Sequence, residues 1–211
     1  MPLSLGIASG AGFLKNPAQP AALGYRVNYI TNPSFEVNTT GWTSVSSGTL
    51  ARTTGQFNIG AASLSVTNSS FSGAQIGNTG AMIPLEAGAG TYYLSAYIKL
   101  GVGNSEAAYS FRVLQYAAQD SSGTVAVETI GAQSLEYTGN WVRLSGSFVK
   151  NGGANFVIIR IVTGSPISGE IFYIDSVMLE KSTTLNSYFD GSSGGFWAGT
   201  AHASISGATP Y

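Results

Sequence analysis

The sequence of 211 residues predicts an all-β protein, and three observations favour this fold class. Apolar residues recur at every second position in many short segments, as expected for strands with one buried face. Turn-forming residues separate these segments, and apolar residues almost nowhere follow a helical spacing. Only 9% of residues are charged, against about 25% in an ordinary soluble domain, while glycine reaches 28 residues. We therefore expect a β-sandwich or a β-barrel.

Residues 91–100 form the clearest of the predicted strands. One face of this segment is apolar and is made of Tyr92, Leu94, Ala96, Ile98 and Leu100. The opposite face carries Tyr93, Ser95, Tyr97 and Lys99. This period of two predicts a half-buried strand whose first face points into the core.

Six further strands are predicted at 62–67, 107–116, 124–130, 140–149, 155–163 and 170–180. Asn151, Gly152 and Gly153 lie between two of them, and these residue types tolerate the positive φ of tight hairpins. We therefore expect 140–149 and 155–163 to form an antiparallel pair. The segment 155–163 is apolar on both faces, which predicts a central strand covered on both sides.

The two ends of the chain differ from the middle. Residues 1–27 are rich in proline and glycine, and residues 182–211 are rich in glycine, serine and threonine. Neither end shows a period that would build a core of its own. The expected organisation is an N-terminal extended arm over 1–27, a β domain over 28–181, and a C-terminal segment over 182–211. The C-terminal segment is expected to dock on the domain or on a neighbouring subunit.

Composition excludes several classes of function. Nine basic and ten acidic residues give a net charge of -1, whereas a nucleic-acid binder needs a basic stripe. The absence of cysteine removes disulfides, thiolate metal sites and cysteine nucleophiles. The longest dense apolar stretch, 156–162, contains Arg160 and is shorter than the roughly 18 residues of a membrane helix. The first 24 residues lack the pattern of a secretory signal, so no export signal is expected.

The sequence also offers little catalytic apparatus. Residues 191–195 satisfy the pattern G-x-S-x-G, but a nucleophile elbow needs a preceding strand and a following helix. His202 is the only histidine, and an isolated imidazole is more often a surface or interface hydrogen-bonding group than a general base. No pair of acids typical of glycoside hydrolysis and no phosphate-binding loop can be recognised. The prediction is a protein that is not an enzyme.

Aromatic residues suggest a binding surface. Tyr93 and Tyr97 lie on the polar face of their strand, and Trp141 and Arg143 alternate with apolar residues in theirs. Aromatic rings stack on the apolar faces of sugars while arginine donates to hydroxyl groups, so these four residues are candidate glycan contacts. The alternative is that a second sheet, a terminal arm or another subunit buries the same rings.

Five strings in the middle of the chain resemble the carbohydrate-binding-module-like jelly rolls appended to xylanases and glucanases. They are N-Y-I-T-N-P-S-F-E-V-N-T-T-G-W at 28–42, G-x-x-S-L-x-V-T at 60–67, Y-L-S-A-Y-I-K at 93–99, W-V-R-L-S-G-S-F at 141–148 and F-Y-I-D-S-V-M-L-E at 172–180. The resemblance covers 28–181 and implies an antiparallel jelly roll. It also implies a structural calcium ion held by Glu36 and Asp175, although Glu36 could equally cap a loop or bond backbone amides.

The C-terminal run Y-F-D-G-S-S-G-G-F-W-A-G-T-A-H-A-S at 188–204 is similar to the endings of many minor tail proteins from phages of actinobacteria. That resemblance implies a non-enzymatic virion protein made in the bacterial cytoplasm, with other virion proteins and copies of itself, such as a trimer, as partners. Its jelly roll would face outward and bind host glycans. A capsid decoration protein and an accessory carbohydrate-binding module or depolymerase component are the alternatives. Low charge agrees with a subunit whose surface is covered in an assembly.

Overall fold

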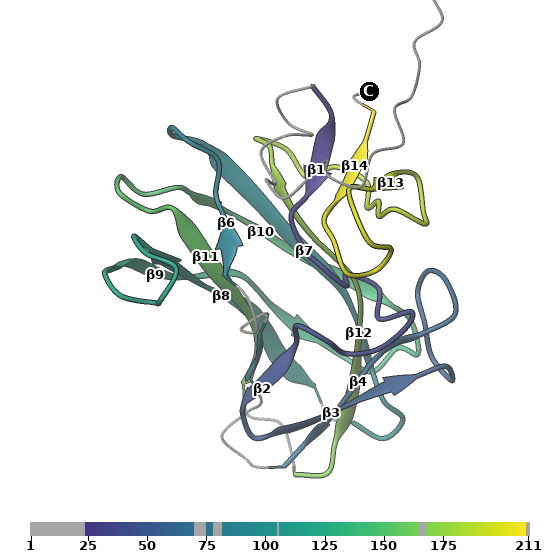
Figure 1. The fold of residues 1–211 in the computed structure, drawn as a ribbon. Coiled ribbons are helices and arrows are strands. Elements are labelled where there is room, and N and C mark those ends of the chain that lie inside the picture. Colours follow the sequence, from purple (N-terminus) through teal and green to yellow (C-terminus); the bar gives the residue numbers. More distant parts are fainter. Residues whose placement is uncertain (1–23, 70–74, 78–81, 105, 165–167, 210–211) are drawn as a thin grey trace, which may run out of the picture.

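The structure is a computed structural model that describes residues 24–69, 75–77, 82–104, 106–164 and 168–209. Every regular element in these residues is a β-strand, and the strands form three sheets (Figure 1). Two larger antiparallel sheets face each other and enclose the core. This arrangement confirms the predicted all-β sandwich.

The first large sheet has five strands in the order β10-β7-β12-β4-β3. Its members are β10 (Val142–Val149), β7 (Thr91–Leu100), β12 (Ile171–Lys181), β4 (Ser63–Asn68) and β3 (Gly48–Thr53). The second large sheet has six strands, five of them in the order β2-β5-β11-β8-β9. They are β2 (Thr43–Ser46), β5 (Gln75–Gly77), β11 (Phe156–Gly164), β8 (Ala107–Tyr116) and β9 (Thr124–Leu135), with β6 (Ile83–Pro84) paired beside them to β11.

The main core lies between these two sheets and follows the predicted alternation. In β7 the expected apolar face is buried in the core, including Leu94, Ala96 and Ile98, each 0% exposed. β8 contributes Phe111 and β11 contributes Ile159 in the same way. Burial of this apolar surface is the main stabilising contribution to such a sandwich.

The middle of β12 contains a β-bulge that changes which residues face the core. The pairing of β12 with β7 shifts register between Asp175 and Met178, and Ser176 has a φ of 52°. After the bulge Leu179 belongs to the main core, while Met178 packs in a second cluster with Phe189. The bulge therefore lets one strand contact both the sandwich and the C-terminal segment.

The predicted pairing of 140–149 with 155–163 is wrong. β10 pairs with β7 in one sheet, and β11 pairs with β8 and β5 in the other. Residues 150–155 instead cross between the sheets, and buried Gln115 bonds the start of this crossing by accepting from Asn151 N and donating to Val149 O. A connection between two layers uses the same flexible residues as a hairpin. The central position predicted for 155–163 is confirmed, since β11 lies between β5 and β8.

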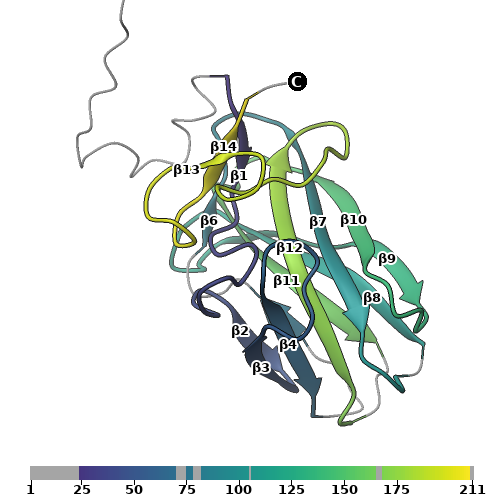
Figure 2. The same ribbon diagram turned by 90° about the vertical axis from the view of Figure 1, so that its right-hand side faces the viewer.

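The third sheet joins the two ends of the described chain. β1 (Arg26–Asn28) pairs with β14 (Ser206–Ala208), which pairs with β13 (Phe196–Trp197). Figure 2 shows β1 and β14 side by side at one end of the molecule. The C-terminal segment therefore docks on its own domain rather than extending as an arm. Residues 1–23 of the expected N-terminal arm lie outside the described residues.

Candidate functional site

Three of the four predicted glycan contacts come together on the outer face of β7 and β10. Tyr93 and Tyr97 alternate with the core residues of β7, and Arg143 lies opposite Tyr97 in the pairing of the two strands. The Arg143 Cζ lies 5.6 Å from the centroid of the Tyr97 ring. Trp141 directly precedes β10, and all four residues are half-buried. We call Tyr93, Tyr97, Trp141 and Arg143 the β7–β10 face.

The C-terminal segment contacts this face. The Arg143 Nη2 donates to the Asn186 carbonyl oxygen at 2.7 Å and to Ser95 Oγ at 3.0 Å. The Arg143 guanidinium is therefore bonded within the protein. This agrees in part with the alternative expectation that a terminal segment buries the β7–β10 face. Tyr93 and Tyr97 remain half-buried beside it.

A second outer face, on the other large sheet, was not predicted from the sequence. Pairing places Thr129 of β9, Arg112 of β8, Arg160 of β11 and Gly77 of β5 in one row across the strands. Residues directly opposite each other in antiparallel strands share one face. Arg112 and Arg160 alternate with core residues of their strands and are half-buried, so both point away from the main core.

An apolar row lies beside this polar row. It consists of Val127, Leu114 and Ile158, which are paired across β9, β8 and β11. Leu114 and Ile158 belong to a cluster separate from the main core, and Val127 is 47% exposed. We call the two rows the β8–β11 face. The alternation of apolar and polar residues in β8 predicts that Arg112 points away from the core. Which strands lie next to β8, and so which residues share its outer face, depends on contacts between residues distant in sequence.

Glu36 and Asp175 both bind the loop at residues 58–62. Each Glu36 oxygen accepts the Ala61 N–H at 3.1 Å, and the Asp175 Oδ2 accepts the Asn58 N–H at 2.7 Å. Asp175 also accepts the N–H of Ile59 and of Ser176. The two carboxylates therefore close the loop by bonding backbone amides, which is the alternative to calcium binding that the sequence leaves open for Glu36.

The chemistry of these two carboxylates suits a cation. Burial raises the pKa of Asp175 to about 7, and the charge of Glu36 adds to this rise, against the opposing effect of the N–H donors. A cation between the carboxylates would relieve their repulsion. Among the described residues no group of three or more acidic, histidine or cysteine side chains is placed to bind a metal. Further ligands would have to be backbone, hydroxyl or water oxygens, and calcium stays a prediction.

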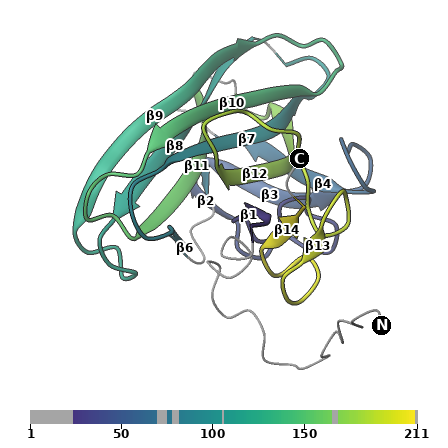
Figure 3. The same cartoon turned by 90° about the horizontal axis from the view of Figure 1, so that it is seen from above.

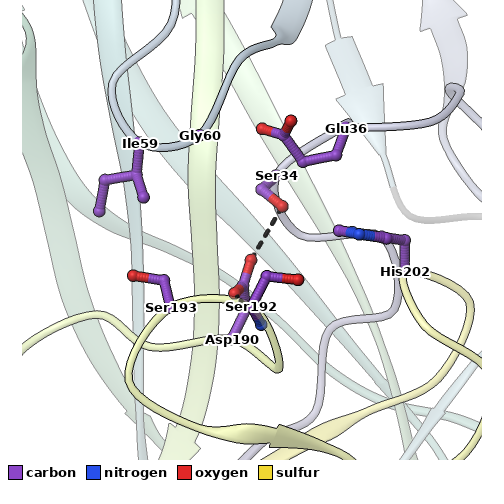
Figure 4. A pocket seen from close by; sticks show the side chains of 8 residues that line it. All are labelled: Ser34, Glu36, Ile59, Gly60, Asp190, Ser192, Ser193 and His202. Atoms are coloured by element: carbon purple, nitrogen blue, oxygen red, sulfur yellow. Dashed lines mark hydrogen bonds between the residues drawn. The ribbon is translucent and has the colours of Figure 1, made fainter.

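A pocket of about 260 Å³ is lined by residues of two sequence motifs, the string at 28–42 and the C-terminal run at 188–204 (Figure 4). Ser34 and Glu36 come from the opening N-P-S-F-E string, and Asp190, Ser193 and His202 come from the C-terminal run. Ser34 Oγ donates to the Asp190 Oδ2 at 2.8 Å, which ties the motifs to each other. Sequence spacing could not predict this convergence because the two motifs are far apart in the chain.

The pocket holds serine, histidine and carboxylate groups, but their bonding does not form a catalytic triad. The Asp190 carboxylate accepts from Tyr188 OH at 2.9 Å and from Ser192 N at 2.8 Å, in addition to Ser34. The buried Nδ1 of His202 has no hydrogen-bond partner among the described residues. A triad needs the base to be oriented by the acid and bonded to the nucleophile. This arrangement fits a structural hydrogen-bonded contact between the motifs.

No helix in the described part of the chain has the length and apolar character needed to cross a membrane.

Solved structures with the same fold include polysaccharide-binding modules. The C-terminal family 22 carbohydrate binding module of Clostridium thermocellum Xyn10B is 19% identical, with a TM-score of 0.59, covering 76% of this chain and 96% of that chain. The CBM22-1 xylan-binding domain of Paenibacillus barcinonensis Xyn10C is also 19% identical, with a TM-score of 0.56, covering 74% and 96%. The enzymatically active domain of tailspike protein 4 of bacteriophage CBA120 is 18% identical, with a TM-score of 0.53, covering 72% and 21%.

No curated protein matches the chain. A protein-family model described as a carbohydrate binding domain matches residues 27–169, which include most strands of the sandwich. The match agrees with the jelly-roll resemblance of residues 28–181. The chain belongs to this carbohydrate binding domain family.

Proposed function

We propose that this protein is a non-catalytic carbohydrate-binding module that binds a glycan along the β8–β11 face. The observation that carries the proposal is the pair of rows on that face, one polar with two arginines and one apolar. Membership of the carbohydrate binding domain family supports the class of ligand. The similar module of Paenibacillus barcinonensis Xyn10C is described as a xylan-binding domain, which suggests a polysaccharide chain rather than a free sugar.

The two rows match the two kinds of surface that a sugar presents. Hydroxyl groups of a glycan can accept from the guanidinium groups of Arg112 and Arg160, and the hydroxyl of Thr129 can also bond them. The apolar C–H face of a ring can pack on Val127, which is 47% exposed.

The β7–β10 face is the alternative surface for the same function. Its aromatic rings are suited to stacking on sugars, but Arg143 is already bonded by Asn186 of the C-terminal segment. This segment lies away from the β8–β11 face, because β13 and β14 are on the opposite side of the molecule from β8 and β9 (Figure 3).

Binding of the full chain to xylan, to cellulose and to host cell-wall polysaccharide tests the proposal. In affinity electrophoresis we expect the double variant Arg112→Ala/Thr129→Ala to lose about tenfold in affinity, and Tyr97→Ala/Trp141→Ala to retain it. The opposite result would assign binding to the β7–β10 face. Failure of the folded wild type to bind any of the three would contradict the function itself.

We also propose that the module is displayed on a phage particle, as a minor tail protein or a capsid decoration protein. The C-terminal motif at 188–204 resembles endings of phage minor tail proteins, and a phage tailspike domain shares the fold. The proposal includes synthesis in the bacterial cytoplasm and assembly as a homo-oligomer with other virion proteins. Mass spectrometry of purified particles should detect the chain, and its absence from them would contradict this role.

A further inference from the structure

A pocket of about 360 Å³ lies where the chain passes from β10 to β11. It shares no residue with the β7–β10 face, the β8–β11 face or the pocket of Figure 4. The loop before β7 and the crossing at 150–155 form its walls, which include Gly88, Lys150, Asn151, Gly152, Gly153 and Asn155. Its volume falls within the range of about 300–1,000 Å³ that is usual for small-ligand sites.

Backbone hydrogen bonds hold the two walls of this pocket together. Leu85 N donates to Asn155 O at 2.8 Å, and the bond from Lys150 N to Gly90 O measures 2.9 Å. The turn at 151–154 is closed by a further backbone bond of 3.1 Å between its ends. The pocket is therefore formed before a ligand arrives, which lowers the ordering cost of binding.

Glycines leave the backbone of both walls uncovered. A Cβ added to Gly88, Gly152 or Gly153 would have no atom within 4 Å, so these positions border open space. Gly88 and Gly153 have φ values of 80° and 85°, which other residues rarely adopt. A ligand in the pocket can therefore approach the peptide groups closely.

Lys150 is the only charged residue lining the pocket within the described part of the chain. Its Nζ donates to the Glu86 carbonyl oxygen at 2.6 Å, which is a neutral acceptor, while the Glu86 carboxylate takes part in a separate salt bridge. Glu128, beside the pocket, accepts from the side-chain amides of Gln115 and Asn151. An ammonium group has three N–H donors, so Lys150 can bond an anion and keep its contact with Glu86.

We propose that this pocket, which we call the Lys150 pocket, binds one sugar unit that carries a carboxylate or phosphate group. Lysine binds such anions as a point charge. The exposed side-chain amides of Asn151 and Asn155 can bond the sugar hydroxyls. The choice of a sugar rests on the proposed carbohydrate-binding function, whereas the site is additional to the β8–β11 face.

NMR titration of the isotope-labelled full chain tests the inference. The charged probes are glucuronate and glucose 6-phosphate, which separate the carboxylate from the phosphate, and glucose is the neutral sugar with the same ring. We expect at least one charged sugar to bind about tenfold more tightly than glucose and to shift the amide signals of Gly152 and Gly153. Inorganic phosphate is the anion without a sugar, and it should bind more weakly than that charged sugar.

Two pairs of variants assign the binding to the Lys150 pocket. Lys150→Gln should abolish the preference for the charged sugar, whereas Lys150→Arg should retain it because the charge remains. Gly152→Leu should abolish binding because the side chain fills the pocket. Gly55→Leu is its matched control, since Gly55 is an exposed glycine of another loop without a positive φ. Urea unfolding of each variant verifies that it is folded.

Three results would overturn the inference and leave polysaccharide binding in place. They are equal affinity of the wild type for charged and neutral sugars, unchanged binding in both Lys150→Gln and Gly152→Leu, and failure of the wild type to bind any of the four probes. Loss of the binding in Arg112→Ala/Thr129→Ala but not in Gly152→Leu would also overturn it, and would assign the sugar to the β8–β11 face. Failure to bind any of the three polysaccharides in the previous experiment would instead contradict the proposed function.

Discussion

Asn28 is a fully buried polar residue that connects three parts of the chain. Its Nδ2 donates to the carbonyl oxygens of Val177 at 3.1 Å and Phe189 at 3.3 Å. Its Oδ1 accepts the N–H groups of Ile30 and Leu179, both at 3.1 Å. One amide thereby joins β1, β12 at and just after its bulge, and the C-terminal segment, with both of its polar atoms bonded.

Replacement of Asn28 by alanine should destabilise the protein strongly. The substitution leaves two backbone N–H and two carbonyl groups with a lost partner in a buried site, and each unsatisfied group costs about 1 kcal/mol or more. We expect the free energy of unfolding in urea to fall by about 3 kcal/mol in Asn28→Ala. Asn140→Ala, at an exposed position, should change it little. Equal stability of the two variants would contradict this assignment.

At the scale of elements, β9 and β10 close one side of the sandwich through two glycines. β9 is an edge strand of one large sheet and β10 is an edge strand of the other. A Cβ on Gly131 would lie 2.5 Å from the carbonyl oxygen of Ser145, and a Cβ on Gly146 would lie 2.8 Å from Gly131 N. Gly131 also has a φ of 63°, which side chains rarely adopt.

Gly131→Ala should therefore separate the two edges. The added methyl group meets backbone on β10 and forces a strained φ, so we expect a loss of roughly 3 kcal/mol in unfolding free energy. Gly152→Ala is the matched control, because nothing lies within 4 Å of its added carbon and its φ is not positive. Urea denaturation of both variants measures the difference, and a fully stable Gly131→Ala would show that this contact does not matter.

The loop at 58–62 is bonded by Glu36 and Asp175, the two predicted calcium ligands. We propose that Ca²⁺ binds at Glu36 and Asp175, as the family resemblance implies. The melting temperature of the wild type should then rise by several degrees in millimolar calcium relative to a chelator, since a ligand bound only to the folded state stabilises it. Glu36→Gln should remove the difference. Identical melting temperatures of the wild type in calcium and in chelator would contradict the proposal.

Long strands were predictable from sequence because their burial pattern is local. β7 and β8 each span ten residues with one face in the core, so the period of two is visible along their whole length. β1 and β14 have three residues each, too few to show a period, and their burial depends on pairing with each other. The residues at 150–155 favour a hairpin in the sequence but form a crossing in the structure, because flexible turn residues do not reveal which sheet the next strand joins.

The candidate sites also divide into features that local sequence patterns predict and features that depend on distant contacts. Tyr93 and Tyr97 lie on one face, as the sequence predicts, because they are four positions apart in one strand. The opposition of Arg112 and Arg160 could not be predicted, since it depends on the register between β8 and β11. The meeting of Ser34 with Asp190 likewise requires the folded positions of two distant loops.

At the scale of the whole molecule, the C-terminal segment and the proposed binding face occupy different sides. β13 and β14 lie beside β1, away from β8 and β9, in the views of Figure 1 and Figure 3. A salt bridge between Arg26 Nε and Glu180 Oε1 at 2.6 Å connects β1 to β12. The segment can therefore complete the domain without covering the β8–β11 face. Attachment through the end that carries β1 and β14 would leave that face directed outward.

Buried tyrosines make the stability of the whole domain sensitive to alkaline pH. Burial, with smaller contributions from neighbouring acids, raises the pKa of Tyr29, Tyr109 and Tyr188 well above the ordinary value of 10.0. Burial also raises the pKa of Tyr92, to about 12. The unfolded chain thus loses these protons at lower pH than the folded chain. The stability they contribute is complete below about pH 10 and decreases as the pH rises toward 12.

We expect the free energy of unfolding to fall steeply above about pH 10, with tyrosinate absorbance near 295 nm rising in the same transition as unfolding. Tyr109→Phe should reduce this pH dependence, because one buried phenol no longer has to stay protonated in the folded state. Tyr137→Phe is the matched control, since Tyr137 is 43% exposed. Urea unfolding curves at about pH 8 and about pH 11 measure both variants against the wild type. An unchanged pH dependence in Tyr109→Phe would show that burial of this phenol does not resist its ionisation.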